Sequence, residues 1–192
     1  MSLFAWRFLR NKLPTKDNLV RRDILHVNDN VCVVDCGSLE TSQHLFMGCA
    51  VSYNVWHHVR VWLGIDFVAP NTLRNHFVQF TYMAGMPRST HMFFKVIWLA
   101  FVWVLWKDRN NCVFNNMTFD HLALIEKIKL NSFLWLKLNQ VLFVYSFHDW
   151  WKHPLLWCLC IIGTSDCVFF GCWHLLHILC GVFSPCYYET PF

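Results

Sequence analysis

Apolar residues recur at helical spacing along the first third of the chain. The pattern predicts two short helices, over residues 3–12 and 16–25, and Pro14 separates them because its ring disfavours helical geometry in the residue before it. A third helix is predicted over residues 51–63, and Gly64 ends it.

Two longer helices are predicted further along the chain. Residues 92–106 are almost wholly apolar, and this run is shorter than the roughly 20 residues that a membrane span needs. The run therefore predicts a buried helix, which the polar residues 107–111 close. Asp120 is placed to cap an amphipathic helix over residues 121–139. The polar and weakly periodic residues 65–91 are interpreted as a linker.

The segment between the second and third predicted helices is rich in turn residues. Asparagine and aspartate occupy positions 28–30, a short apolar run covers 31–34, and Gly37 permits a chain reversal. This segment predicts a short strand followed by a tight turn, with the outline of a small hairpin.

The density of charged residues falls sharply near Pro154, and the only formal charge from His153 to Pro185 is Asp166. Residues 167–183 reach the lower length limit of a spanning helix, although two histidines lie within them. Three interpretations stay open: translated non-coding sequence, since thymine-rich codons specify these residue types, a membrane anchor over residues 154–183, and a packed core.

Composition and charge narrow the function classes. The chain has 192 residues with 56% hydrophobic and 15% charged residues, which excludes an intrinsically disordered protein. The net charge is +4, and residues 1–22 alone carry +5. A short basic segment is typical of contact with phosphates or an anionic membrane surface, and a solvated helix face is the alternative. The basic residues of this segment are Arg7, Arg10, Lys12, Lys16, Arg21 and Arg22.

Three cysteines and a histidine follow the spacing C-x3-C-x7-H-x4-C, at Cys32, Cys36, His44 and Cys49. Zinc prefers four thiolate or imidazole ligands in a tetrahedron, and each pair here spans one tight turn. Four protein ligands leave no position for water or substrate, so the spacing predicts one structural zinc ion. Folding of so short a segment is expected to depend on the metal.

Other interpretations of these residues stay open. No secretory signal peptide is visible, so a metal site is favoured over a disulfide framework for the early cysteines. The simpler alternative is three buried free cysteines beside an unrelated histidine. Asp35 and Glu40 are candidates for hydrogen bonds to His44. Three further histidines are candidate substitute ligands, but their spacing is less regular and surface histidines are the favoured interpretation: His26, His57 and His58.

Catalytic signatures are missing from the sequence. It contains no phosphate-binding glycine loop, dinucleotide-binding motif or nucleophile elbow. Cys158 and Cys160 form a C-x-C pair, which lacks the spacing of thiol–disulfide enzymes. No two neighbouring aspartates are present to bind paired metal ions. Neither catalysis nor a small-molecule substrate is expected.

The sequence resembles the reverse transcriptase zinc-binding domain of plant LINE-type retrotransposons, which lack long terminal repeats. The resemblance is close over residues 1–64, and it rests on the stretches LFAWRFLRNKLPTKDNLVRR, CVVDCGSLETSQHLFMGC and VWHHVRVWLGI. Residues 97–116, the helix after them and the stretch 151–154 also resemble the downstream end of such polyproteins. The resemblance implies that Cys32, Cys36, His44 and Cys49 are zinc ligands and that the module binds nucleic acid.

Upstream endonuclease and polymerase domains are absent from this sequence, so it is interpreted as a fragment of such a polyprotein without catalysis of its own. The expected partner is the backbone of RNA or DNA, with Trp6 or Phe8 stacking on bases; the alternative for both rings is helix core. A structural or protein-interaction zinc module and a small membrane protein are the rival functions. An intracellular location, nuclear or cytoplasmic, is expected, with the membrane as the alternative.

The predicted fold is mainly α. A small zinc-knuckle-like turn or hairpin lies between the short N-terminal helices and the longer apolar helices, and an irregular hydrophobic tail follows. The predicted organisation is a zinc-binding domain over 1–64, a linker over 65–91, a helical region over 92–153 and a cysteine-rich tail over 154–192.

Overall fold

The structure is a computed structural model that describes residues 2–34, 36–66, 68, 70, 72–83, 85–139 and 146–155. Within these residues the secondary structure is helical, which confirms the mainly α prediction. The helices are α1 (Ser2–Leu9), α2 (Lys16–Val20), α3 (Ala50–Leu63), α4 (Leu73–Thr81), α5 (His91–Asn115), α6 (His121–Asn139) and α7 (Phe147–Lys152). Shorter turns are η1 (Val27–Asp29), η2 (His44–Gly48) and η3 (Arg88–Thr90).

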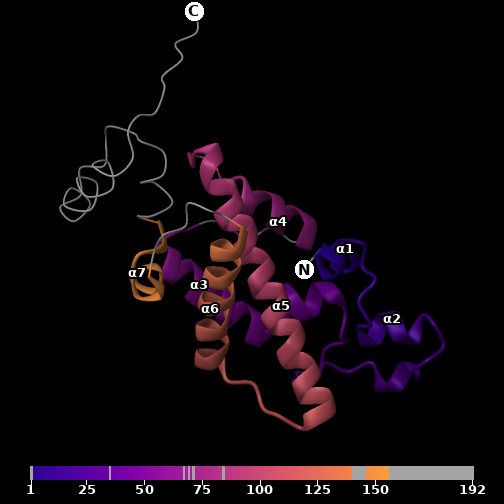
Figure 1. Cartoon of the computed structure of the whole chain (residues 1–192). Coiled ribbons are helices and arrows are strands. Elements are labelled where there is room, and N and C mark those ends of the chain that lie inside the picture. Colours follow the sequence, from indigo (N-terminus) through magenta and orange to yellow (C-terminus); the bar gives the residue numbers. More distant parts are fainter. Residues whose placement is uncertain are drawn as a thin grey trace, which may run out of the picture.

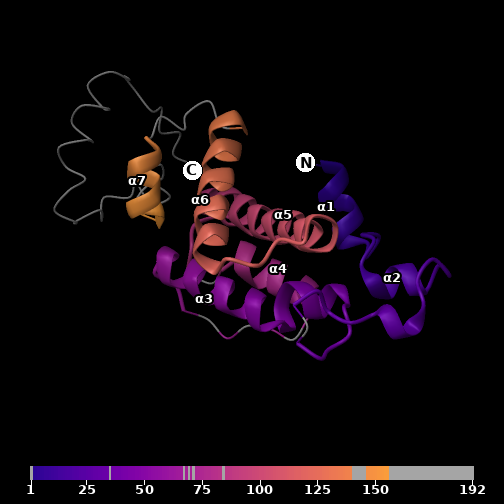
Figure 2. The ribbon, with the colours of Figure 1, turned by 90° about the horizontal axis from the view of Figure 1, so that it is seen from below.

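Helix α5 lies at the centre of the arrangement. In Figures 1 and 2, α1 and α2 lie on one side of it, and α6 and α7 lie on the other. Its length of 25 residues lets it contact both groups, and it packs along α6 and against α4. The apolar run between Phe93 and Trp106 is almost entirely buried, as the sequence predicts.

One hydrophobic core joins the N-terminal segment to the later helices. Phe8 of α1 packs edge-on against both Phe46 of η2 and Trp98 of α5, at ring-centroid distances of 4.8 and 5.4 Å. Trp56 of α3 stacks on Phe101 of α5 with 3.6 Å between centroids. Residues of the regions 1–64 and 92–153 therefore belong to one hydrophobic core.

Several predicted elements are found where the sequence places them. Helix α3 ends at Gly64, whose φ of 63° is the left-handed conformation that glycine adopts without strain. Asp120 caps α6, and its Oδ1 accepts hydrogen bonds from the backbone N–H groups of Leu122 and Ala123. The first two helices are shorter than predicted. Helix α1 ends at Leu9, before the turn at Asn11, where φ is 49°, and α2 ends at Val20, before the turn at Asp23, where φ is 56°.

The strand predicted at residues 31–34 is not formed in the described part of the chain. It is reduced to one antiparallel bridge between Val31 and Leu39, which closes the turn around Gly37. The segment 65–91, interpreted as a linker, contains α4, which Thr72 caps through a hydrogen bond from the Asn75 N–H to its Oγ1. Helix α4 is amphipathic and too short for its periodicity to stand out in sequence.

The sequence predicts that the polar residues 107–111 end the helix that begins near residue 92, and this prediction is wrong. Helix α5 continues to Asn115 because two of these polar side chains are paired with residues from other elements. Asp108 accepts from Lys127 of α6 at 2.9 Å, and Arg109 pairs with Glu40. Helix α7 has no counterpart among the predicted elements, and it is anchored by the fully buried Trp150, whose Nε1 donates to the Lys129 carbonyl at 3.1 Å.

Among the described residues, no helix combines the length and apolar character that a membrane crossing requires. The membrane anchor predicted over residues 154–183, including the span at 167–183, lies outside the described residues from position 156 onward.

His76 is a buried titratable group in the core. Trp98 Nε1 donates to its Nδ1 at 3.0 Å, and the ring lies 4.5 Å from that of Trp56. Burial, together with the nearby positive charge of Arg60, lowers the pKa of His76 to about 4. The folded chain therefore holds this imidazole neutral.

We predict that this histidine makes stability fall with acid. Folded His76 binds its proton more weakly than the unfolded chain does, so stability is lost as pH falls from about 6.5 to about 4, by on the order of 3 kcal/mol. The variant His76→Asn keeps an acceptor for Trp98 and does not titrate. Urea unfolding from pH 7 to 4 should give a flatter stability curve for this variant, and parallel curves would contradict the prediction.

Candidate metal centre

The first pair of predicted ligands lies on the turn that the Val31–Leu39 bridge closes. The backbone N–H of Cys32 donates to the Ser38 carbonyl at 2.9 Å, which holds the two sides of the turn together. Gly37 has a φ of 74°, a conformation that favours glycine, and it directly follows Cys36. Cys32 is buried and Cys36 is exposed, so the turn places one sulfur beneath the other.

The second pair lies at the two ends of the π-helical turn η2: His44 is its first residue, and Cys49 directly follows its last residue. The backbone N–H of His44 donates to Thr41 Oγ1 at 3.0 Å, which fixes the start of η2. Cys49 is the N-cap residue of α3, and its N–H donates to the His44 carbonyl at 2.7 Å. Beneath this turn Phe46 is fully buried, and its carbonyl accepts from Trp56 Nε1 at 3.1 Å.

The four side chains Cys32, Cys36, His44 and Cys49 converge, and their ligand atoms all lie within 4.8 Å of one another. Cys36 Sγ and His44 Nε2 are 3.2 Å apart. A tetrahedral zinc site with Zn–S bonds of about 2.3 Å separates neighbouring sulfurs by about 3.8 Å. The donor set of three thiolates and one imidazole fits a single zinc ion, and each ligand comes from a short, hydrogen-bonded turn.

The two buried sulfurs, of Cys32 and Cys49, share a hydrogen bond that shifts the pKa of both thiols. The Cys32 thiol donates a hydrogen bond to the Cys49 sulfur, which lowers the pKa of Cys49 to about 5 and raises the pKa of Cys32 above its usual range. The backbone N–H of Val51 also favours the Cys49 thiolate, whereas burial opposes it. Zinc prefers thiolate ligands, so binding would release the proton that this pair shares.

The predicted hydrogen bond between Glu40 and His44 is not formed, because the Glu40 carboxylate has other partners. This carboxylate is fully buried and accepts from Arg109 of α5, with the shortest contact of 2.6 Å to Nη2. It also accepts from the Lys16 backbone N–H at 3.0 Å. Glu40 therefore ties the ligand-bearing turn to α2 and α5, and it acts on the site by fixing the chain between Leu39 and Thr41.

Comparison with known families decides what this arrangement is. Residues 1–56 match the family described as zinc-binding in reverse transcriptase. This segment is a reverse transcriptase zinc-binding domain. The match includes all four side chains of the cluster, which together form a site for one zinc ion. No curated protein and no solved structure matches the chain.

The substitute ligands considered for the zinc-binding domain do not join the cluster in the described structure. His26, His57 and His58 are exposed, and the Nδ1 of His58 lies 2.7 Å from the Asn54 carbonyl. Asp35 lies outside the described residues. Arg109 is the residue of the site that sequence reasoning missed, since nothing in its own neighbourhood indicates a partner 69 positions earlier.

The basic residues of the zinc-binding domain lie on α1, α2 and the turns after them. Arg21 pairs with Asp17 at 2.9 Å, and Lys16 Nζ donates to the Val31 carbonyl. The other four are exposed and make no ion pair with any described residue: Arg7, Arg10, Lys12 and Arg22. Of the two aromatic candidates, Phe8 belongs to the core at 5% exposure, whereas Trp6 is 53% exposed.

Proposed function

We propose that this chain carries a structural zinc module that binds the phosphate backbone of RNA or DNA through its basic N-terminal segment. The observation that carries the proposal is a set of exposed cations, without carboxylate partners among the described residues, beside a zinc-organised turn. Such cations bind phosphates by displacing the counterions condensed on the nucleic acid. Because they have no carboxylate partner among the described residues, no ion pair has to be broken first. The resemblance to LINE-type retrotransposons supports the same partner class.

We propose further that the module has no catalytic activity. The four candidate ligands fill a tetrahedral shell, so a bound zinc ion would have no open position for water or substrate. A zinc ion in such a shell supplies rigidity and no Lewis-acid chemistry. The role of the metal is then to hold the turn against α2 and α5, so that the basic segment keeps a fixed shape.

The proposal predicts a steep salt dependence of binding. Arg21 is paired with Asp17, which leaves five of the six basic residues for phosphates. Five contacts give a slope of log affinity against log salt of about −3.5 for a single strand and about −4.5 for a duplex. Fluorescence anisotropy of the full chain with a 20-nucleotide RNA, at 50 to 300 mM salt, measures this slope.

A matched pair of triple variants separates the basic segment from overall charge. Substituting Arg7, Arg10 and Lys12 with serine should lower the magnitude of the single-strand slope by about 2. The control replaces three exposed cations outside the segment, Arg74→Ser, Arg88→Ser and Lys95→Ser, and should leave the slope nearly unchanged. Binding that ignores salt, or an equal effect of both triples, would contradict the proposal and favour a protein-interaction module.

A further inference from the structure

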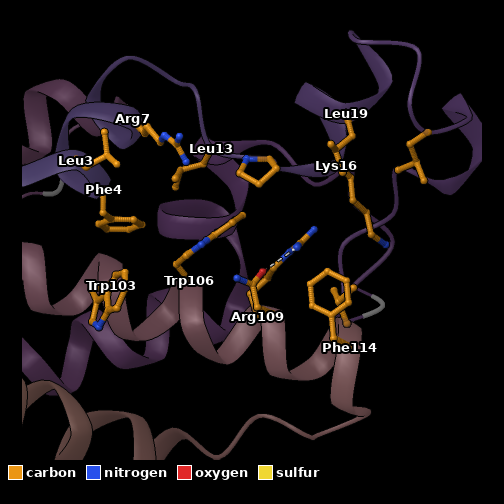
Figure 3. Close-up of a pocket in the computed structure, with 14 residues that line it drawn as sticks. Leu3, Phe4, Arg7, Leu13, Lys16, Leu19, Trp103, Trp106, Arg109 and Phe114 are labelled. Atoms are coloured by element: carbon orange, nitrogen blue, oxygen red, sulfur yellow. Dashed lines mark hydrogen bonds between the residues drawn. The ribbon is translucent and has the colours of Figure 1, made fainter. Parts of the chain in front are cut away.

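A cleft of about 690 Å³ lies between the basic segment and the C-terminal half of α5. Its walls come from α1, the turn after it, α2 and α5, so it opens within the zinc-binding domain but uses a later helix as one side. Figure 3 shows the lining side chains, which are mostly apolar. Four of them are aromatic: Phe4, Trp103, Trp106 and Phe114.

Three of the aromatic side chains pack against other side chains in the cleft, and the fourth, Phe114, is exposed. Phe4 and Trp103 meet edge-on with 4.9 Å between their ring centroids, and Trp106 is nearly buried, with the guanidinium of Arg109 5.2 Å from its ring. Phe114 differs from these, because it is 75% exposed on the last turn of α5. Figure 3 shows Phe114 at the same end of the cleft as Lys16.

The charge in the cleft is positive. Arg7, Lys16 and Arg109 line it, and no acidic side chain is among its described lining residues. Arg109 is neutralised by Glu40, so it contributes little net charge. Arg7 has no ion pair with a described residue, and Lys16 Nζ donates to the neutral Val31 carbonyl, so both keep their full charge. Arg7 lies on α1 and Lys16 on α2, and Phe114 lies on α5, which forms the other side of the cleft.

We propose that this cleft takes an unstacked base of a single-stranded nucleic acid, which stacks on Phe114 while neighbouring phosphates contact Arg7 and Lys16. The inference rests on the proposed function and names its ligand class. An aromatic ring face stacks with every base, and a cation beside it matches the phosphate that each base carries. A base within a duplex is already paired and stacked, so it cannot enter without being extruded.

The test measures affinities of the full chain at 50 mM salt for one 12-nucleotide sequence as RNA, as single-stranded DNA and as a DNA duplex. Phe114→Ala and Phe114→Leu should each weaken binding to the single strands by about tenfold, because stacking is lost in both. Phe114→Tyr keeps an aromatic face and should change affinity less than about twofold. Tyr53→Ala, on the exposed surface of α3, is the control and should also have little effect.

The outcomes separate the two proposals. If single strands and duplex bind equally and no Phe114 variant changes affinity, the cleft proposal is overturned while phosphate binding by the basic segment stands. If none of the three nucleic acids binds, the proposed function fails and this inference fails with it. If instead an acidic helical peptide with leucine at every third or fourth position binds in a Phe114-dependent way and the RNA does not, the cleft is a protein-docking surface and the proposal is overturned.

Discussion

Cys36→Ser is expected to lower the zinc content of the full chain by one ion. Cys36 is exposed, so its substitution removes a ligand without opening a hole in the core. A hydroxyl is a poorer zinc ligand than a thiolate, and three remaining ligands hold the ion far more weakly. Native mass spectrometry measures the zinc content of the wild-type chain and of the variant. Any metal bound elsewhere is common to both proteins, so it does not affect the difference between them.

Removal of zinc should loosen the ligand-bearing turn and leave the central helices folded. Among its described residues the turn has one β-bridge and a few hydrogen bonds, whereas α5 and α6 are held by a large apolar core. Hydrogen exchange in excess chelator should therefore increase at residues 30–49, with the amides of α5 still protected. Protection unchanged over 30–49 would show that the metal does not organise this segment.

Cys112→Ser is the matched control for the metal prediction. Cys112 lies on α5, is partly buried and is not part of the cluster. Its replacement should leave both the zinc content and the exchange pattern as in the wild type. Loss of zinc in this control, or retention in Cys36→Ser, would mean that the four candidate side chains are not the ligand set.

The ligand cluster could be predicted from sequence because its geometry is local. Cys32 and Cys36 span one turn, and His44 and Cys49 span another, so their spacing carries most of the information about the site. Helix α3 and the Asp120 cap of α6 were predictable for the same reason, since capping and termination depend on neighbouring residues.

The remaining features depend on contacts between distant elements. Residues 107–111 look like the end of a helix because they are polar, yet Asp108 and Arg109 are buried in pairs with Lys127 and Glu40. Helix α4 gains its stability from packing His76 and Phe80 against α3 and α5. Sequence periodicity contains no information about such partners, so it underestimates the length of α5 and misses α4.

Glu40 illustrates the same limit at the site itself. Its position beside the ligands suggested a hydrogen bond to His44, since acidic residues often support a metal-bound histidine. The structure instead directs the carboxylate inward to Arg109, where three contacts of 2.6 to 3.2 Å satisfy it. Its role is to position the turn, and the strength of that role can be measured.

Arg109→Ala should destabilise the fold by about 3 to 5 kcal/mol in urea unfolding of the zinc-loaded chain. The substitution leaves the fully buried Glu40 carboxylate without its cation, with only the Lys16 backbone N–H as a charge-stabilising donor among the described contacts. Because Glu40 lies next to the bridge residue Leu39, the same change should speed the transfer of zinc to a chelator. Glu40→Gln should act in the same direction, since it leaves Arg109 buried with an unpaired charge.

Arg21→Ala is the matched control, because it breaks an arginine–carboxylate pair of similar length at the surface. Arg21 and Asp17 are 2.9 Å apart, but the Arg21 side chain is 60% exposed, so its loss should cost less than about 1 kcal/mol. Combining Glu40→Gln with Arg109→Met should cost less than the sum of the two single changes, since neither charge is then left buried alone. Equal effects of Arg109→Ala and Arg21→Ala, with unchanged zinc transfer, would show that the Glu40–Arg109 pair does not hold the ligand-bearing turn in place.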